Sequence, residues 1–256
     1  MRILAIGDVV GPCGRSLLER KLWNIRKTMG IDMVVANGEN ASSGNGLLPG
    51  DADALFLSGV DVITSGNHIW NRREIYAYLD EKPHVIRPAN YPERSPGAGY
   101  CLFDTGAARV LVINLLGNVF IGALDDPFDT ADAILAKGIE ADVILVDIHA
   151  EATSEKKALA CYLDGRVSAV FGTHTHVQTN DAQILAGGTG YLTDLGMTGA
   201  TDSILGVKKE IVIEKFRSRL PVRFQQAEGE AEIQGLLLDV DEKTGTCRSA
   251  EVLRLS

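Results

Sequence analysis

The sequence predicts a layered α/β fold, and two observations support this prediction. Short runs of Val, Ile and Leu, each as long as a strand, alternate with segments of helical period. Continuous apolar runs are typical of strands buried on both faces, with helices packed over the sheets. In addition, 45% of the 256 residues are hydrophobic, which suffices for a sizeable core. Because no linker stands out, we expect a single domain over residues 1–256.

The expected elements follow one another along the chain. Strands are predicted at Ile3–Ile6, Met33–Ala36, Val62–Thr64, Val110–Leu116, Val143–Ile148 and Val167–Phe171. Helices are predicted at Arg15–Met29, from near Pro49, at about Arg72–Leu79, at Asp129–Lys137 and at Ser154–Leu163. From Ile211 the pattern indicates strands, interrupted by the turn DEKTG before a last alternating segment, CRSAEVLRL. We therefore expect the C-terminal part of the fold to be antiparallel.

Charge and composition exclude several classes of function. The formal net charge is −9, whereas a protein that coats long nucleic acids needs clustered Lys and Arg. A small anionic substrate is still compatible, because bound metal ions reverse the local field of an acidic pocket. No apolar run approaches the roughly 20 residues that cross a bilayer. The N-terminal MRILAIGDVVG resembles a core strand more than a signal peptide, so we expect a cytoplasmic protein without a membrane segment.

Polar residues that can bind metals follow the apolar runs. They lie at, or just past, the C-terminal ends of expected strands, the edge where open α/β sheets gather side chains around a ligand. Taken singly, each has an ordinary role as a helix cap, a turn residue or a core residue. Together they supply carboxylates, amides and imidazoles at one edge, which predicts a metal site. The residues are Asp8, Glu39, Asn40, Asn67, His68, His149, His174 and His176.

Two short motifs are the most specific of these signals. In GTHTH, residues 172–176, an extended chain points His174 and His176 to one side and the small Thr175 to the other. In GNH, residues 66–68, the glycine permits a tight turn and Asn67 offers a carbonyl oxygen. The sequence contains no P-loop, no GxGxxG and no GxSxG nucleophile motif. The donors are nitrogen and oxygen without sulfur, which suits Mn, Fe or Zn better than Mg.

The order of these motifs resembles the calcineurin-like metallophosphoesterases, in which GD, an acidic metal bridge, GNH, an isolated His and GHTH follow one another. The sequence is still more similar to the bacterial YmdB-like family of 2′,3′-cyclic nucleotide phosphodiesterases, through NGEN, DIHAEATSEK, GTHTHVQT and YLTDLGMTG. Val10 and Glu39 depart from the usual His and Asp of the wider superfamily, and the YmdB-like family shares both departures. The resemblance implies a β-sandwich flanked by helices, in the order α-β-β-α.

The resemblance also implies a binuclear metal-dependent phosphodiesterase with two Fe, Mn or Zn ions. A hydroxide between the ions would attack phosphorus, and His68 would protonate the leaving oxygen as general acid. Alternatively, His68 orients Asn67 or the phosphate, and Asn40 is only a turn residue. The implied ligands are Asp8, Asn40 and His176 for one ion, Asn67, His149 and His174 for the other, and Glu39 as the bridge.

Other reactions on the same metals remain open. Phosphomonoester or phosphoprotein hydrolysis would use the same ligands, and a regulatory protein could bind metal and nucleotide with little turnover. His68 argues against a pure binding protein, because binding alone needs no general acid. The expected partner is a small anionic phosphodiester such as a cyclic nucleotide, and the family resemblance implies a homo-oligomer.

Overall fold

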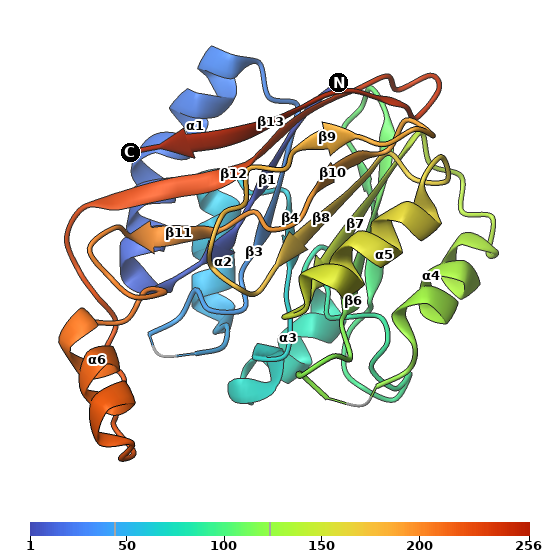
Figure 1. Ribbon diagram of the computed structural model, residues 1–256. Coiled ribbons are helices and arrows are strands. Elements are labelled where there is room, and N and C mark those ends of the chain that lie inside the picture. The colour runs from blue at the N-terminus through green and yellow to red at the C-terminus, as the bar shows by residue number, and fades with distance from the viewer. Residues whose placement is uncertain (44, 123) are drawn as a thin grey trace.

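The computed structural model describes residues 1–43, 45–122 and 124–256, which form two β-sheets with helices on their outer sides (Figure 1). One sheet has the order β2-β11-β12-β1-β3-β4 with β13 beside β12, and the other has the order β5-β6-β7-β8-β10-β9. The predicted layered α/β fold is therefore confirmed. The first sheet contains β1 (Arg2–Ile6), β2 (Asp8–Val9), β3 (Met33–Asn37), β4 (Val62–Thr64), β11 (Met197–Ala200), β12 (Ala231–Val240) and β13 (Cys247–Leu255).

The second sheet contains β5 (Tyr100–Asp104), β6 (Arg109–Leu116), β7 (Val143–His149), β8 (Ala169–Thr173), β9 (Gln183–Ile184) and β10 (Gly190–Leu192). The helices are α1 (Gly11–Met29), α2 (Pro49–Ser58), α3 (Ile75–Glu81), α4 (Pro127–Leu135), α5 (Thr153–Leu163) and α6 (Lys209–Ser218), with the 3-10 turn η1 at Ile69–Asn71. Each sheet contains a run of neighbouring parallel strands: β1, β3 and β4 in one, and β6, β7, β8 and β10 in the other. Their carboxyl ends therefore share an edge within each sheet.

The parallel strands are buried on both faces, which explains their continuous apolar sequences. In β1, Ile3 belongs to the apolar cluster between the two sheets, together with Leu145 of β7. The next residue, Leu4, faces the other way and packs in the cluster that includes α1 and α2. Beyond the second sheet, Val146 packs with Leu159 of α5. The alternation of faces along each strand thus produces the four layers, with α1 and α2 on one side and α4 and α5 on the other (Figure 1).

The prediction of strands from Ile211 onward is wrong at its start. Residues Lys209–Ser218 form α6, which extends away from the sheets (Figure 1). The apolar β-branched residues Ile211–Ile213 resemble a strand, but charged residues surround them at helical spacing and only Val212 in α6 is buried. Strand structure resumes at β12. The DEKTG turn and the last strand are as predicted, with β12 and β13 antiparallel.

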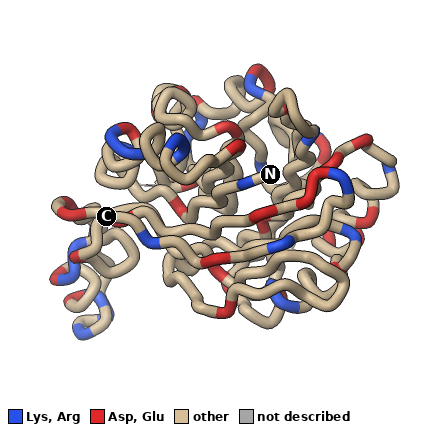
Figure 2. Tube along the Cα trace, turned by 90° about the horizontal axis from the view of Figure 1, so that it is seen from above, with Lys and Arg blue, Asp and Glu red and all other residues tan. Residues whose placement is uncertain are grey.

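The surface carries charges of both signs. Figure 2 shows basic and acidic segments interspersed along the chain, rather than a basic face, in the view from above. Within the described ranges, no helix combines the length and the apolar character that a bilayer crossing requires.

Candidate metal centre

The parallel strands bring the predicted site residues to the edge where their carboxyl ends lie. Asp8 follows β1, while Glu39 and Asn40 follow β3. Asn67 and His68 follow β4, so these five residues come from the first sheet. The second sheet contributes the three remaining imidazoles: His149 is the last residue of β7, and His174 and His176 follow β8. Contacts between residues from the two sheets place the site at their common edge.

Glu39 is the centre of one group of donors. Its Oε1 atom lies 3.2 Å from Nε2 of His149 and 3.2 Å from Nδ1 of His68. Nε2 of His149 in turn lies 3.0 Å from Nδ1 of His174. One potential ligand atom from each of Glu39, His149 and His174 falls within a common span of 4.8 Å. These three residues form a candidate metal-binding cluster, because one cation can contact donors at such spacing.

Asp8, Asn40 and His176 form a second group beside the first. Oδ1 of Asp8 lies 3.5 Å from Nε2 of His176, which is 3.3 Å from Nδ2 of Asn40. Asn40 also donates to Oε1 of Glu39 at 3.1 Å. The two groups are therefore contiguous, and Glu39 lies between them.

Two oxygens of predicted ligands lack hydrogen-bond donors. Oδ1 of Asp8 and Oδ1 of Asn67 are both buried, and neither has a hydrogen-bond partner among the described residues. A buried acceptor without a donor is costly, unless a cation or water compensates it. Together with the imidazole and carboxylate groups of the two groups above, these oxygens make the donor set fit for metal ions of the kind that prefer nitrogen and oxygen.

The glycine of GNH is required by close packing within the site. A Cβ atom on Gly66 would lie 2.2 Å from Cδ2 of His149 and 2.5 Å from Oε2 of Glu39. The backbone N–H of His68 donates to the same Oε2 at 2.9 Å. The turn after β4 thus approaches the acidic and imidazole groups directly, which places Asn67 beside them.

The GTHTH segment is not extended beyond Thr173, contrary to the prediction. His174 has φ 100° and His176 has φ 63°, so both non-glycine residues occupy the left-handed region. Each such residue costs about 1–3 kcal/mol and persists only where surrounding contacts hold it. His174 turns toward His149, whereas His176 turns toward Asp8. Thr175 does point away from both, toward Asp194.

The charges of the site shift the pKa values of its members. Burial alone would raise the pKa of Glu39, but His149 and His68 beside it hold this pKa well below its usual range. Asp8 is also buried, and His176 lowers its pKa in the same way. Conversely, burial would lower the pKa of His149, but the carboxylate of Glu39 and other acidic groups raise it to about 9. The pKa of His174 falls to about 4 through burial and the charge of His149.

Several supporting residues were not predicted from the sequence. The hydroxyl of Thr173 lies 2.9 Å from Nδ1 of His149 and donates its proton to the buried Asp147 at 2.7 Å. Glu151 lies 3.2 Å from Nε2 of His174. Asn37 accepts from the backbone N–H of Glu39 at 3.1 Å. Asp147 had a detectable signal, since a carboxylate inside the apolar run VILVDI is unusual.

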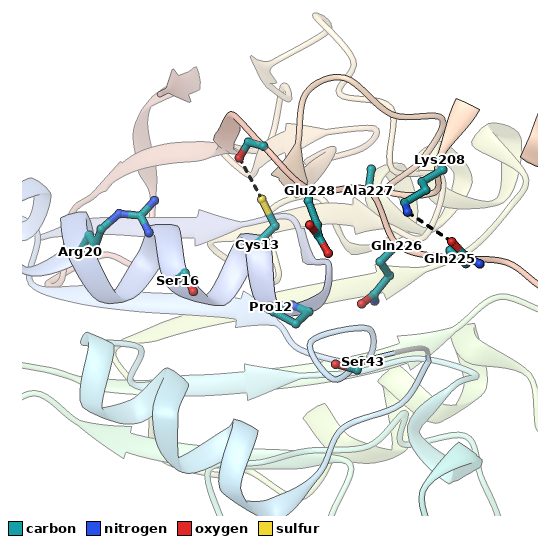
Figure 3. A pocket seen from close by; sticks show the side chains of 11 residues that line it. Pro12, Cys13, Ser16, Arg20, Ser43, Lys208, Gln225, Gln226, Ala227 and Glu228 are labelled. Carbon is teal, nitrogen blue, oxygen red and sulfur yellow. Dashed lines mark hydrogen bonds between the residues drawn. The ribbon is translucent and has the colours of Figure 1, made fainter. Parts of the chain in front are cut away.

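A cavity beside the start of α1 is separate from the predicted site. A cavity of about 540 Å³ lies between the start of α1 and residues 225–229 (Figure 3). Its lining includes Cys13, Arg20, Lys208 and Glu228, and Cys13 donates to a backbone carbonyl there. None of the predicted site residues is among the described residues that line it. The chemistry of the site is therefore assigned from the donor geometry and not from the cavity.

Known proteins are similar to this chain over more than nine-tenths of its length. The 2′,3′-cyclic-nucleotide 2′-phosphodiesterase of Bacillus subtilis (strain 168) is 47% identical over 245 residues, which is 95% of this chain and 93% of the relative. The crystal structure of a hypothetical protein from Thermus thermophilus has a TM-score of 0.94 and 43% identity, covering 100% of this chain and 99% of that one. A phosphatase structure from Mycoplasma pneumoniae has a TM-score of 0.94 and 32% identity, with coverages of 100% and 93%.

The two-sheet fold and these relatives define the class of the protein. It is a hydrolytic phosphoesterase with the fold of the calcineurin-like metallophosphoesterases. The sequence profile of the YmdB-like protein family matches residues 4–253, and the chain belongs to this family.

Proposed function

We propose that this protein is a binuclear metal-dependent phosphodiesterase that hydrolyses small phosphodiesters, in particular 2′,3′-cyclic nucleotides. The observation that supports the metal centre best is the pair of contiguous donor groups that share Glu39, with two buried oxygens left without hydrogen-bond donors. The substrate class is supported by the name of the Bacillus subtilis relative.

The proposed centre holds two ions of Fe, Mn or Zn. When bound, such ions supply Lewis-acid stabilisation of a phosphate and lower the pKa of a nucleophilic water. The chain supplies the donors, and Gly66 and the turn after β4 supply the close approach that groups them. The proposed ligands are Asp8, Asn40 and His176 for one ion, Asn67, His149 and His174 for the second, and Glu39 for both.

His68 is the proposed general acid. Its backbone is fixed by the hydrogen bond to Glu39, and Nδ1 of its ring lies 2.9 Å from Oδ1 of Asn40. The side chain remains 30% exposed, so a substrate can reach it. An imidazole ring held in this way can deliver a proton to the leaving oxygen of a phosphodiester. Without that proton the oxygen would depart as an alkoxide, which is a poor leaving group.

The proposal is tested by quantifying metal in the purified protein and assaying 2′,3′-cyclic AMP, first with Mn added and then after stripping with chelator. We expect turnover to follow metal occupancy up to two ions per chain and to be lost in Asp8→Ala and His149→Ala. A simple phosphomonoester assayed in parallel separates diester from monoester specificity. Full metal occupancy without turnover of any phosphodiester would contradict the proposal.

Three further parts of the proposal concern the protein as a whole. One catalytic domain over residues 1–256 is supported by the apolar cluster that both sheets share. A homo-oligomer is supported by the exposed apolar side chains of α6, among them Ile213 and Phe216. We also propose a cytoplasmic location. Light scattering during size-exclusion chromatography measures the oligomeric state. A monomer at micromolar concentration would contradict the proposed homo-oligomer.

A further inference from the structure

The loop that carries His174 and His176 is held from outside the donor groups. Thr175, between the two histidines, donates to Oδ2 of Asp194 twice: its backbone N–H at 3.2 Å and its hydroxyl at 2.8 Å. His174 and His176 both have positive φ, a conformation that needs such contacts to persist. The carboxylate of Asp194 therefore holds Thr175, the residue that links the two histidines.

The same carboxylate also fixes the backbone against which Asp8 lies. Oδ1 of Asp194 accepts from the N–H of Gly196 at 2.8 Å, and the carbonyl of Gly196 accepts from the N–H of Asp8 at 3.0 Å. Oδ2 of Asp8 then accepts from the N–H of His174 at 3.0 Å. The two oxygens of Asp194 thus connect to Asp8 by one route and to His174 and His176 by another.

Asp194 is itself oriented by a lysine buried in the molecule. Nζ of Lys156, from α5, donates to Oδ2 of Asp194 at 2.6 Å, and the side chains are 0% and 1% exposed respectively. A Cβ atom on Gly172 of β8 would lie 1.9 Å from the carbonyl oxygen of Thr193 and 2.7 Å from Cδ of Lys156. The glycine of GTHTH therefore leaves room for the strand to lie close to the backbone of Thr193 and for the Lys156 stem beside it.

We propose that Lys156 and Asp194 are positioning residues that set the directions of three proposed metal ligands: Asp8, His174 and His176. This inference rests on the proposed metal centre. It also assigns a role to Lys156, which ends DIHAEATSEK, and to Asp194, which lies in YLTDLGMTG. Residues that orient metal ligands in this way commonly change metal affinity 10- to 100-fold when replaced.

A buried ion pair that served only stability would behave differently. Such a pair can often be replaced by apolar residues of similar size without loss of stability, whereas removal of one partner leaves a buried charge unpaired. The test therefore separates folding from ligand positioning. Asp194→Asn removes the negative charge that pairs with the ammonium group of Lys156. The double variant Lys156→Met/Asp194→Leu removes both charges, and it also removes the oxygen that accepts hydrogen bonds from Thr175.

The experiment measures Mn affinity by calorimetry and the thermal unfolding of the metal-free protein. We expect Asp194→Asn to weaken Mn binding about 10- to 100-fold and to lower the unfolding temperature. In the double variant we expect the unfolding temperature to recover while Mn binding stays weakened to the same degree. At saturating Mn, kcat falls in both variants and KM changes little. Asp164→Asn is the control, because Asp164 accepts from the backbone of Gly187 and lies outside the site.

Recovery of wild-type Mn affinity in the double variant, or wild-type affinity in Asp194→Asn, would overturn the inference. Thr175→Val keeps the test decisive if both Asp194 variants fail to fold, since it removes only the hydroxyl contact to Asp194 and a longer one from the N–H of Val177 at 3.4 Å. We expect it to weaken Mn binding to a smaller extent, and unchanged affinity would count against the inference. Wild-type protein that binds no metal would instead contradict the proposed function together with the inference.

Discussion

Nδ1 of His149 lies 2.9 Å from the hydroxyl oxygen of Thr173, on the neighbouring strand. The hydroxyl donates its own proton to the buried carboxylate of Asp147 at 2.7 Å, so its lone pairs face the imidazole. When His149 is neutral, Nδ1 therefore carries the ring proton and donates it to Thr173. In this tautomer the lone pair of Nε2 faces Glu39. A histidine that binds a metal ion through Nε2 requires the same tautomer.

Thr173→Val removes the oxygen that selects this tautomer and keeps the size of the side chain. We expect Mn affinity to fall about 10- to 100-fold, as for other changes behind metal-bound histidines. Titration calorimetry measures the effect. Thr189→Val is the matched control, because Thr189 is equally buried but bonds to Val167. Equal affinities in the two variants would show that Thr173 does not orient His149.

Gly66→Ala tests the close packing of the turn after β4. The added Cβ would lie 2.2 Å from His149 and 2.5 Å from Glu39, so one of these side chains must move. We expect loss of Mn binding and of activity. Gly50→Ala is the control: Gly50 lies in α2 with no atom near its missing Cβ, and alanine there should stabilise the helix by about 0.5–1 kcal/mol. A Gly66→Ala protein that binds Mn normally would contradict the geometry.

The site could be predicted largely from the places where apolar runs end. Asp8, Glu39 and His149 follow runs that could only be buried strands, and parallel strands deliver their ends to one edge. The conformation of the GTHTH segment could not be predicted in this way. Its left-handed residues depend on contacts of Thr175 with Asp194, 19 residues away, and of His174 with Asp8, 166 residues away.

The fold was predictable where periodicity and burial agree. Both faces of β1 and β7 are buried, so the apolar runs gave the correct elements. In α6 the apolar pattern of the sequence and the burial of the side chains disagree. Its apolar residues are mostly exposed, and the β-branched run Ile211–Ile213 has the local preference of a strand. Local sequence alone carries no information on what that helix packs against.

Metal binding should strengthen as pH rises toward about 9. The pKa of His149 is raised to about 9 by Glu39 and other carboxylates, in spite of burial, so the metal-free protein holds a proton there that a bound ion must displace. Below that pH we expect roughly a tenfold gain in affinity per pH unit from this one proton. Calorimetry in buffers of different ionisation enthalpy measures the proton release. Mn binding without proton release at pH about 7.5 would contradict this assignment.

The stability of the metal-free protein should change in the opposite sense. A His149 pKa raised from its usual value of 6.5 to about 9 gives a stabilising contribution that is complete below about 6.5 and is lost as pH rises through about 9. The unfolding temperature measured with chelator present should therefore fall over this interval. The fall should be smaller in His149→Gln, which cannot titrate, and equal slopes in both proteins would assign the change to other groups.

His68→Gln distinguishes general-acid catalysis from a purely orienting role. We expect kcat for 2′,3′-cyclic AMP to fall about 10²- to 10⁴-fold at unchanged metal content, because glutamine can donate a hydrogen bond but cannot transfer a proton. A nitrophenyl phosphodiester needs no proton on its leaving oxygen, so its hydrolysis should fall far less. His84→Gln is the control, since His84 packs edge-on against Phe103, with ring centroids 5.2 Å apart. Equal losses of kcat on both substrates would mean that His68 only orients the phosphate or Asn40. Oδ1 of Asn40 lies 2.9 Å from Nδ1 of His68.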